Sequence, residues 1–195
     1  MHLISNEIDE NGRRLGSLGH CEMYFHTDKC YQENPHRAST LYTMEISSSG
    51  GHTKFASLYH AYDKIPDDLR EMLNGRHALQ VYDFGTGPVG PDVNIDELMH
   101  CWQPIFVTNP DTKKNALYIN RLMTSRIEGL DTLWKIIESP DNIYEHKWST
   151  GDIIVWDNFS SVYARTDWPQ DERFDAVEHR VKVWPKGNQF VVTVV

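Results

Sequence analysis

The sequence predicts one mainly β domain that carries a few helical insertions. Three observations support this class. Many short stretches are rich in β-branched and aromatic residues and are bounded by turn residues. Apolar residues at helical spacing are confined to two segments. The length of 195 residues suits one domain with its own core better than two. We therefore expect residues 1–195 to fold as a single domain.

The first half of the chain predicts three strands followed by a helical segment. Residues 3–4 and 21–25 flank a polar, glycine-containing stretch that predicts a turn. Residues 39–46 alternate and contain Thr, Tyr and Ile, which favours a strand. Residues 55–73 carry apolar side chains at helical spacing, and Pro66 either begins a second helix or kinks the first.

The second half contains a loop, a helix and several further strands. Residues 84–94 contain five Gly or Pro residues and predict a surface loop. Residues 131–137 carry Leu, Trp and Ile at helical spacing and end before a proline. The other predicted strands, each rich in aliphatic or aromatic residues, are 104–107, 116–119, 152–156, 180–184 and 189–195.

Composition and charge exclude several classes of protein. The net charge of −9 gives no basic field to attract nucleic acid or an anionic membrane. No apolar run approaches the ~20 residues of a membrane-spanning helix, and the N-terminus lacks the pattern of a secretory signal. The three cysteines have no CxxC spacing, which favours reduced thiols and a cytoplasmic location.

His26 and Asp28 form the first candidate metal site. They are two residues apart, and residues at this spacing on an extended chain face the same side. One imidazole and one carboxylate can therefore converge on one cation. Two histidines and one carboxylate, with other positions left open, is the ligand set of non-haem Fe(II) oxygenases. On its own the pair is more often a hydrogen-bonded surface pair than a metal site.

A longer series of motifs resembles the taurine dioxygenase (TauD/TfdA) family of Fe(II)/2-oxoglutarate-dependent dioxygenases. The resemblance spans about residues 20–185, with the motifs in the family's order. The strings that carry it are FHTD at 25–28, LY at 41–42, GGHTKFA at 50–56, AYDKIP at 61–66, NPDTKKNALYIN at 109–120, WSTGDIIVWDN at 148–158, ARTDW at 164–168, ER at 172–173 and HRV at 179–181.

The resemblance implies a fold, a reaction and cofactors. The fold would be a double-stranded β-helix, or jelly roll, that lacks the family's N-terminal elements. The reaction would be oxidation, typically hydroxylation, of a small organic substrate, with release of succinate and CO2. Fe(II) would be the metal and 2-oxoglutarate the cosubstrate.

The resemblance also implies roles for particular residues. His26 and Asp28 match the iron ligands, and Trp156 matches a residue beside the iron. Thr53 and Arg180 match the residues that bind the distal carboxylate of 2-oxoglutarate, where a planar guanidinium gives a two-point grip. Arg173 is the second candidate for that grip. Two structural alternatives stay open: Thr53 as a helix cap and Trp156 as a core residue.

The chain departs from the family at two important places. Tyr163 occupies the position of the family's second histidine ligand, and a neutral phenol is a poor donor to Fe(II) unless the metal helps to deprotonate it. A catalytically impaired relative that acts as a binding or partner subunit is therefore the alternative function. The short N-terminal region predicts exposed apolar surface, which favours a homodimer or a partner subunit.

Overall fold

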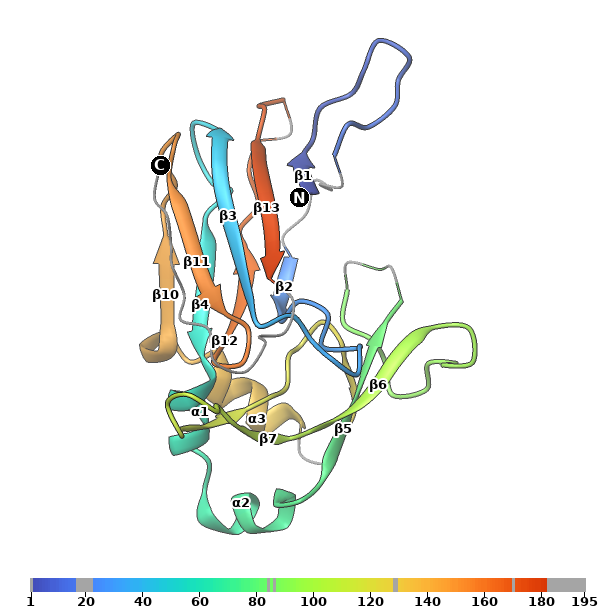
Figure 1. Ribbon diagram of the computed structural model, residues 1–195, viewed down its shortest axis with the longest axis vertical. Helices are drawn as coiled ribbons and strands as arrows, with labels where there is room; N and C mark the ends of the chain where they lie inside the picture. Colours follow the sequence, from blue (N-terminus) through green and yellow to red (C-terminus); the bar gives the residue numbers. More distant parts are fainter. Residues whose placement is uncertain are drawn as a thin grey trace.

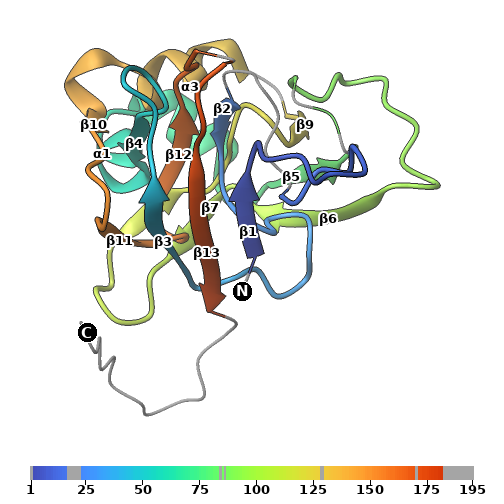
Figure 2. The ribbon, with the colours of Figure 1, turned by 90° about the horizontal axis from the view of Figure 1, so that it is seen from above.

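The protein forms a sandwich of two antiparallel β-sheets with helices packed at one end. The structure, a computed structural model, describes residues 2–16, 23–83, 85, 87–127, 130–169 and 171–181. Figures 1 and 2 show the two sheets face to face. The first sheet has the strand order β1 (His2–Ser5), β13 (Asp175–Val181), β3 (Ala38–Glu45), β11 (Ile153–Asp157). This architecture agrees with the mainly β class that the sequence predicts and with the jelly roll that the motif resemblance implies.

The second sheet faces the first and carries the helices on its outer side. Its order is β10 (Ile143–His146), β4 (Thr53–Ser57), β12 (Ser161–Arg165), β2 (Met23–His26). The helices are α1 (Leu58–Asp63), α2 (Asp67–Leu73), α3 (Leu130–Ile137) and the short 3₁₀ helix η1 (Pro140–Asn142). The largest buried core contains residues of β2, β4 and β12 together with residues of all three α-helices.

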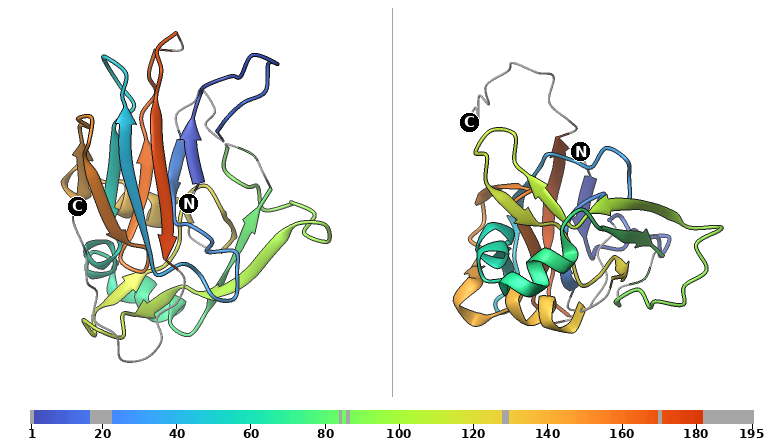
Figure 3. Two further views of the ribbon diagram at one scale, coloured as in Figure 1. Left: turned by 45° about the horizontal axis from the view of Figure 1, so that its top comes forward. Right: turned by 90° about the horizontal axis from the view of Figure 1, so that it is seen from below.

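A smaller group of strands extends from the sandwich. The three-stranded sheet β6 (Met99–Pro104), β5 (His77–Tyr82), β9 (Thr124–Arg126) projects to one side (Figure 3). The hairpin of β7 (Phe106–Thr108) and β8 (Asn115–Leu117) lies beside it in the chain, and β8 packs on α1. A main-chain hydrogen bond connects this insertion to the sandwich: the amide of Leu122 donates to the carbonyl of Phe25 at 3.2 Å.

Side chains along β12 alternate between a face that packs on the helix-covered core and a face that points toward the first sheet. Val162 and Ala164 are buried in the core beneath the helices. Tyr163 and Arg165 alternate with them and are only partly buried, so they face the first sheet. The outer face of that first sheet exposes several large apolar side chains, namely Tyr42, Met44, Ile153 and Val155. No helix in the described part of the chain is long and apolar enough to cross a membrane.

The predicted strands are largely confirmed, and the first helix is corrected. The predictions at 3–4, 39–46, 116–119 and 152–156 correspond to β1, β3, β8 and β11. The helix expected from residue 55 begins at Leu58 instead. Residues 53–57 form β4, because main-chain bonds to β10 and β12 on both sides outweigh their helical spacing. Strands β5, β9, β10 and β12 were not predicted, and the strand at 189–195 lies outside the described residues.

The loop and the last predicted helix are also confirmed. The described residues of 84–94 form neither helix nor strand, as expected. The helix expected at 131–137 is α3. Pro66 separates α1 from α2, with its own φ of −54° at the start of α2, so it begins a second helix rather than kinking one long helix.

Candidate metal and cosubstrate site

His26 and Asp28 lie together where β2 leaves the sheet. Both side chains are 5% exposed. The Nδ1 atom of His26 lies 3.0 Å from the carbonyl oxygen of Tyr24, so Nδ1 is the protonated nitrogen and donates to that carbonyl. The lone pair of the ring is then on Nε2. A main-chain contact that fixes the tautomer in this way is typical of a histidine prepared to bind a metal.

Asp28 is held by two hydroxyl groups, one on each carboxylate oxygen. Ser39 Oγ, on β3 of the facing sheet, donates to Asp28 Oδ2 at 2.6 Å. Ser39 in turn accepts a bond of 3.0 Å from Asn158 Nδ2. The hydroxyl of Tyr163 donates to Asp28 Oδ1 at 3.1 Å. Donors on both oxygens stabilise the charged carboxylate in a buried place and fix its direction.

Tyr163 is the residue that joins β12 to this pair. It lies opposite His26 in the register of β12 and β2, and the two ring centroids are 4.1 Å apart. The ring of Trp156 lies 4.7 Å from that of Tyr163, and the ring of Phe55 lies 6.3 Å from it. Trp156 Nε1 is buried and has no hydrogen-bond partner in the part of the chain that the structure describes. Trp156 therefore lies beside the candidate site and presents an unsatisfied donor there.

The donors present fit a metal ion only if Tyr163 is counted. Within the described residues, no group of three or more His, Cys, Asp or Glu side chains could hold a metal ion. His26, Asp28 and Tyr163 nevertheless bring an imidazole, a carboxylate and a phenol oxygen to one place, and the phenol is 3.1 Å from the carboxylate. This set can hold a cation with one imidazole fewer than the usual two-histidine, one-carboxylate arrangement.

Thr53 and Arg180 lie on the strands that surround this group. Thr53 Oγ1 is buried in β4 and accepts a bond of 2.9 Å from Trp148 Nε1. Ser57, not Thr53, caps α1, so the helix-cap alternative for Thr53 is excluded. The main chain of Arg180 pairs with Ser39 across β13 and β3, and its side chain lies outside the described part of the structure.

Arg173 lies two residues before the start of β13 and already has carboxylate partners. Its guanidinium contacts Asp175 Oδ2 at 2.7 Å, Glu7 Oε2 at 3.0 Å and Glu45 Oε2 at 3.2 Å. Its hydrogen bond to Asp175 is the main cause that raises the pKa of the guanidinium. In the register, Asp175 pairs with Glu45 whereas Arg180 pairs with Ser39. The structure therefore does not bring Arg173 together with His26 and Asp28.

A buried polar network supports the turn that carries Asp28. Asn120 Nδ2 donates to Cys30 Sγ at 3.3 Å and to Gln80 Oε1 at 3.2 Å, and Thr124 Oγ1 donates to the same Gln80 oxygen at 2.9 Å. Burial raises the pKa of the Cys30 thiol to about 12, so this cysteine is a neutral structural group. Sequence reasoning missed Ser39 and this network because no local pattern links residues so distant in the chain.

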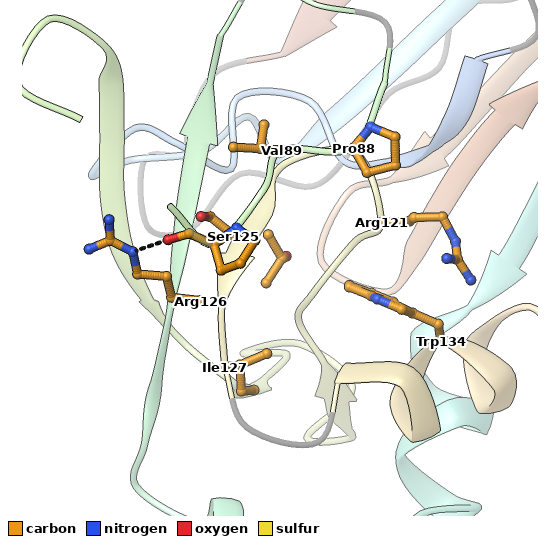
Figure 4. Close-up of a pocket in the computed structure, with 9 residues that line it drawn as sticks. Pro88, Val89, Arg121, Ser125, Arg126, Ile127 and Trp134 are labelled. Atoms are coloured by element: carbon orange, nitrogen blue, oxygen red, sulfur yellow. Dashed lines mark hydrogen bonds between the residues drawn. The ribbon is translucent and has the colours of Figure 1, made fainter. Parts of the chain in front are cut away.

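A surface cavity of about 450 Å³ lies apart from these residues (Figure 4). It is lined by Pro88, Val89, Pro91, Arg121, Thr124, Ser125, Arg126, Ile127 and Trp134. Its two arginines already have protein partners: Arg126 Nε donates to the Pro91 carbonyl at 2.8 Å, and Arg121 makes a two-point ion pair with Glu138. The cavity contains none of the candidate metal ligands.

Comparison with known proteins identifies the family. The family model described as "Taurine catabolism dioxygenase TauD, TfdA family" matches residues 2–180. The chain belongs to the TauD/TfdA family. A pentalenolactone F synthase of Streptomyces avermitilis is 33% identical over 88% of this chain and 64% of its own length. An α-ketoglutarate-dependent 2,4-dichlorophenoxyacetate dioxygenase of Burkholderia sp. is 26% identical over 86% of this chain and 62% of its own length. The chain thus spans slightly less than two thirds of these TauD/TfdA relatives.

Solved structures of TauD/TfdA type share the fold. A taurine dioxygenase from Burkholderia xenovorans superposes with a TM-score of 0.69 at 23% identity, over 81% of this chain and 56% of that one. AAD-2 in complex with Mn(II) and N-oxalylglycine superposes with a TM-score of 0.71 at 22% identity, over 81% of this chain and 68% of that one. These likenesses confirm the jelly roll that the motifs imply.

Proposed function

We propose that this member of the TauD/TfdA family is a Fe(II)- and 2-oxoglutarate-dependent dioxygenase that oxidises a small organic substrate and releases succinate and CO2. The observation that carries the proposal is the convergence of His26, Asp28 and Tyr163 from β2 and β12. The dependence on α-ketoglutarate in the name of the Burkholderia relative supports the choice of cosubstrate.

In this proposal His26 and Asp28 hold the iron, and the phenol oxygen of Tyr163 is the third protein ligand. Bound iron would supply the oxidising chemistry by using O2 and the cosubstrate. The Tyr24 carbonyl orients the imidazole, and Ser39 orients the carboxylate. These contacts prepare both ligands before the metal binds, which lowers the cost of organising the site.

Thr53 and Arg180 are proposed to bind the distal carboxylate of 2-oxoglutarate. Thr53 supports this role because its hydroxyl is buried on a strand adjacent to Tyr163 and is already fixed by Trp148. Arg180 supports it because its main chain is opposite Ser39, the residue that contacts Asp28. Arg173 stays the weaker candidate, since three carboxylates surround it.

The impaired relative remains the second candidate, because one contact favours it. The Tyr163 hydroxyl that should complete a metal site instead donates to Asp28. A phenol that keeps its proton in this bond cannot serve as an anionic ligand. The chain would then retain a carboxylate-binding pocket and act as a binding or partner subunit.

The test is turnover of the cosubstrate. Fe(II) and 2-oxoglutarate are added without O2, and the visible charge-transfer band of the chelated cosubstrate is recorded before O2 is admitted and succinate is measured. A band followed by succinate supports the dioxygenase, and absence of both favours the binding subunit. We further expect Arg180→Ala to weaken 2-oxoglutarate binding more than Arg173→Ala, and the reverse order would move the role to Arg173.

The remaining parts of the proposal concern substrate, location and assembly. The substrate is proposed as a small organic molecule, selected in part by the 84–94 loop. The cytoplasm is supported by the free thiols of Cys30 and Cys101. A homodimer or a partner subunit is supported by the exposed apolar side chains on the outer face of the first sheet.

A further inference from the structure

Lys29 directly follows the candidate metal ligand Asp28, and the family motifs give it no role. Its φ of 58° lies in the left-handed region, which is sterically disfavoured for a residue with a side chain. Lys113 has nearly the same φ, 60°, but lies in the exposed turn between β7 and β8. Lys29 differs because it is partly buried beside a buried carboxylate, and strained main chain of this kind is concentrated at functional sites.

The ammonium group of Lys29 lies between the turn that carries Asp28 and the start of the 84–94 loop. Its Nζ atom donates to the hydroxyl of Tyr31 at 2.7 Å and lies 5.2 Å from the centroid of the Tyr31 ring. Tyr31 is buried and stacks on Tyr82, with ring centroids 4.8 Å apart. Tyr82 is the last residue of β5, two residues before the loop begins (Figure 1). The packed rings therefore hold the ammonium group near that loop.

The positive charge of Lys29 forms no salt bridge with any residue that the structure describes. Its two contacts, a phenol and an aromatic ring, are both neutral. The adjacent carboxylate of Asp28 already accepts hydrogen bonds from Ser39 and Tyr163. Because Lys29 is only partly exposed, water compensates its charge less fully than it would at the surface. A cation in such a place attracts a negatively charged molecule.

We propose that Lys29 binds a negatively charged group of the substrate that is oxidised, and so restricts the substrate to small organic anions. This inference rests on the proposed function. The group is not the distal carboxylate of 2-oxoglutarate, because β12 lies between β2, which leads to Lys29, and β4, which carries Thr53. The substrate would lie on the side of the candidate metal site where β5 and the 84–94 loop approach it.

The experiment compares two probes of the same shape that differ in charge, cyclohexanecarboxylate and cyclohexanecarboxamide. Each probe is titrated calorimetrically, without O2, into protein that has been loaded with Mn²⁺ and 2-oxoglutarate. We expect the wild type to bind the carboxylate about tenfold more tightly than the amide, and Lys29→Met to bind the two alike. Lys29→Arg should retain the preference because it keeps the positive charge.

Two further variants separate the side chain from the main chain. Lys29→Gly removes the side chain and suits the positive φ, so the preference should vanish in a protein that stays folded, as checked by urea denaturation. Lys113→Met changes a lysine of nearly the same φ on the exposed turn and should match the wild type. The affinity for 2-oxoglutarate, measured before the probes are added, should be unchanged in every variant.

The outcomes separate this inference from the function on which it rests. If the preference persists in Lys29→Met, or if the wild type shows none, Lys29 does not bind a substrate anion, even when the wild type forms succinate. If Lys29→Met also loses affinity for 2-oxoglutarate, Lys29 serves the cosubstrate and the inference is overturned. If the preference depends on Lys29 but no succinate forms with iron, the dioxygenase proposal fails and the anion-binding role of Lys29 stands.

Discussion

His26 and Tyr163 lie directly opposite each other on the antiparallel strands β2 and β12, with ring centroids 4.1 Å apart. The tyrosine hydroxyl donates a hydrogen bond to Asp28. Tyr163, more than a hundred positions after His26 in the sequence, thus contacts both members of the candidate metal pair. Whether the phenol acts as a ligand or as a hydrogen-bond donor decides the chemistry of the site.

Replacing Tyr163 by histidine should strengthen metal binding. The imidazole restores a neutral nitrogen donor opposite His26, so we expect the affinity for Mn²⁺ or anaerobic Fe(II) to rise by about tenfold or more. Isothermal titration calorimetry measures the change. Tyr42→His is the matched control, because Tyr42 is 41% exposed on the outer face of β3. Equal affinities for the wild type and Tyr163→His would show that residue 163 is not at the metal.

Replacing Tyr163 by phenylalanine separates the two roles of the phenol. The ring packing on Trp156 is retained while the oxygen and its bond to Asp28 are removed. If the phenol oxygen is a ligand, as we propose, metal affinity falls below that of the wild type in the same titration. A rise in affinity would mean that the hydroxyl competes with the metal for Asp28, which would favour the binding-subunit alternative.

Gly50 should tolerate no side chain. Its φ of +71° lies in the left-handed region, and a Cβ there would collide with the carbonyl oxygen of Asp167. Gly75 has nearly the same φ, +73°, with nothing within 4 Å of an added Cβ. We expect Gly75→Ala to lower the free energy of unfolding by about 1 kcal/mol and Gly50→Ala to lower it by clearly more. Urea denaturation of the two variants tests this, and equal losses would contradict the predicted collision.

Cys30 should make the protein less stable at alkaline pH. Burial raises the pKa of its thiol from 9.0 to about 12, so the unfolded chain loses this proton at a lower pH than the folded chain. Stability from this group is complete below pH 9 and is lost as the pH rises above it, by about 1 kcal/mol at pH 10 relative to pH 8. Urea denaturation at the two pH values measures the difference. The Cys30→Ala variant should lose this part of the pH dependence. Cys101 is more exposed than Cys30, so the Cys101→Ala variant should keep it.

The sequence by itself determined the family, the jelly-roll class and the candidate ligands. Alternating β-branched residues predict β3 and β11 because each strand faces solvent on one side and the interior on the other. The spacing of His26 and Asp28 needs only an extended main chain to place both on one side. Tyr163 could be assigned to the metal from its position after Trp156 in a family motif.

Only the tertiary structure decided which distant groups share the site. The pairing of β4 with two neighbours turned residues 53–57 from a predicted helix into a strand, and this places Thr53 opposite Arg165. Strand β13 begins after Arg173 and places Arg180 opposite Ser39, so the two arginines lie at different ends of the strand. The contact of Ser39 with Asp28 joins two sheets. Such relationships depend on strand register and sheet packing, which are set by non-local hydrogen bonds that local sequence patterns do not encode.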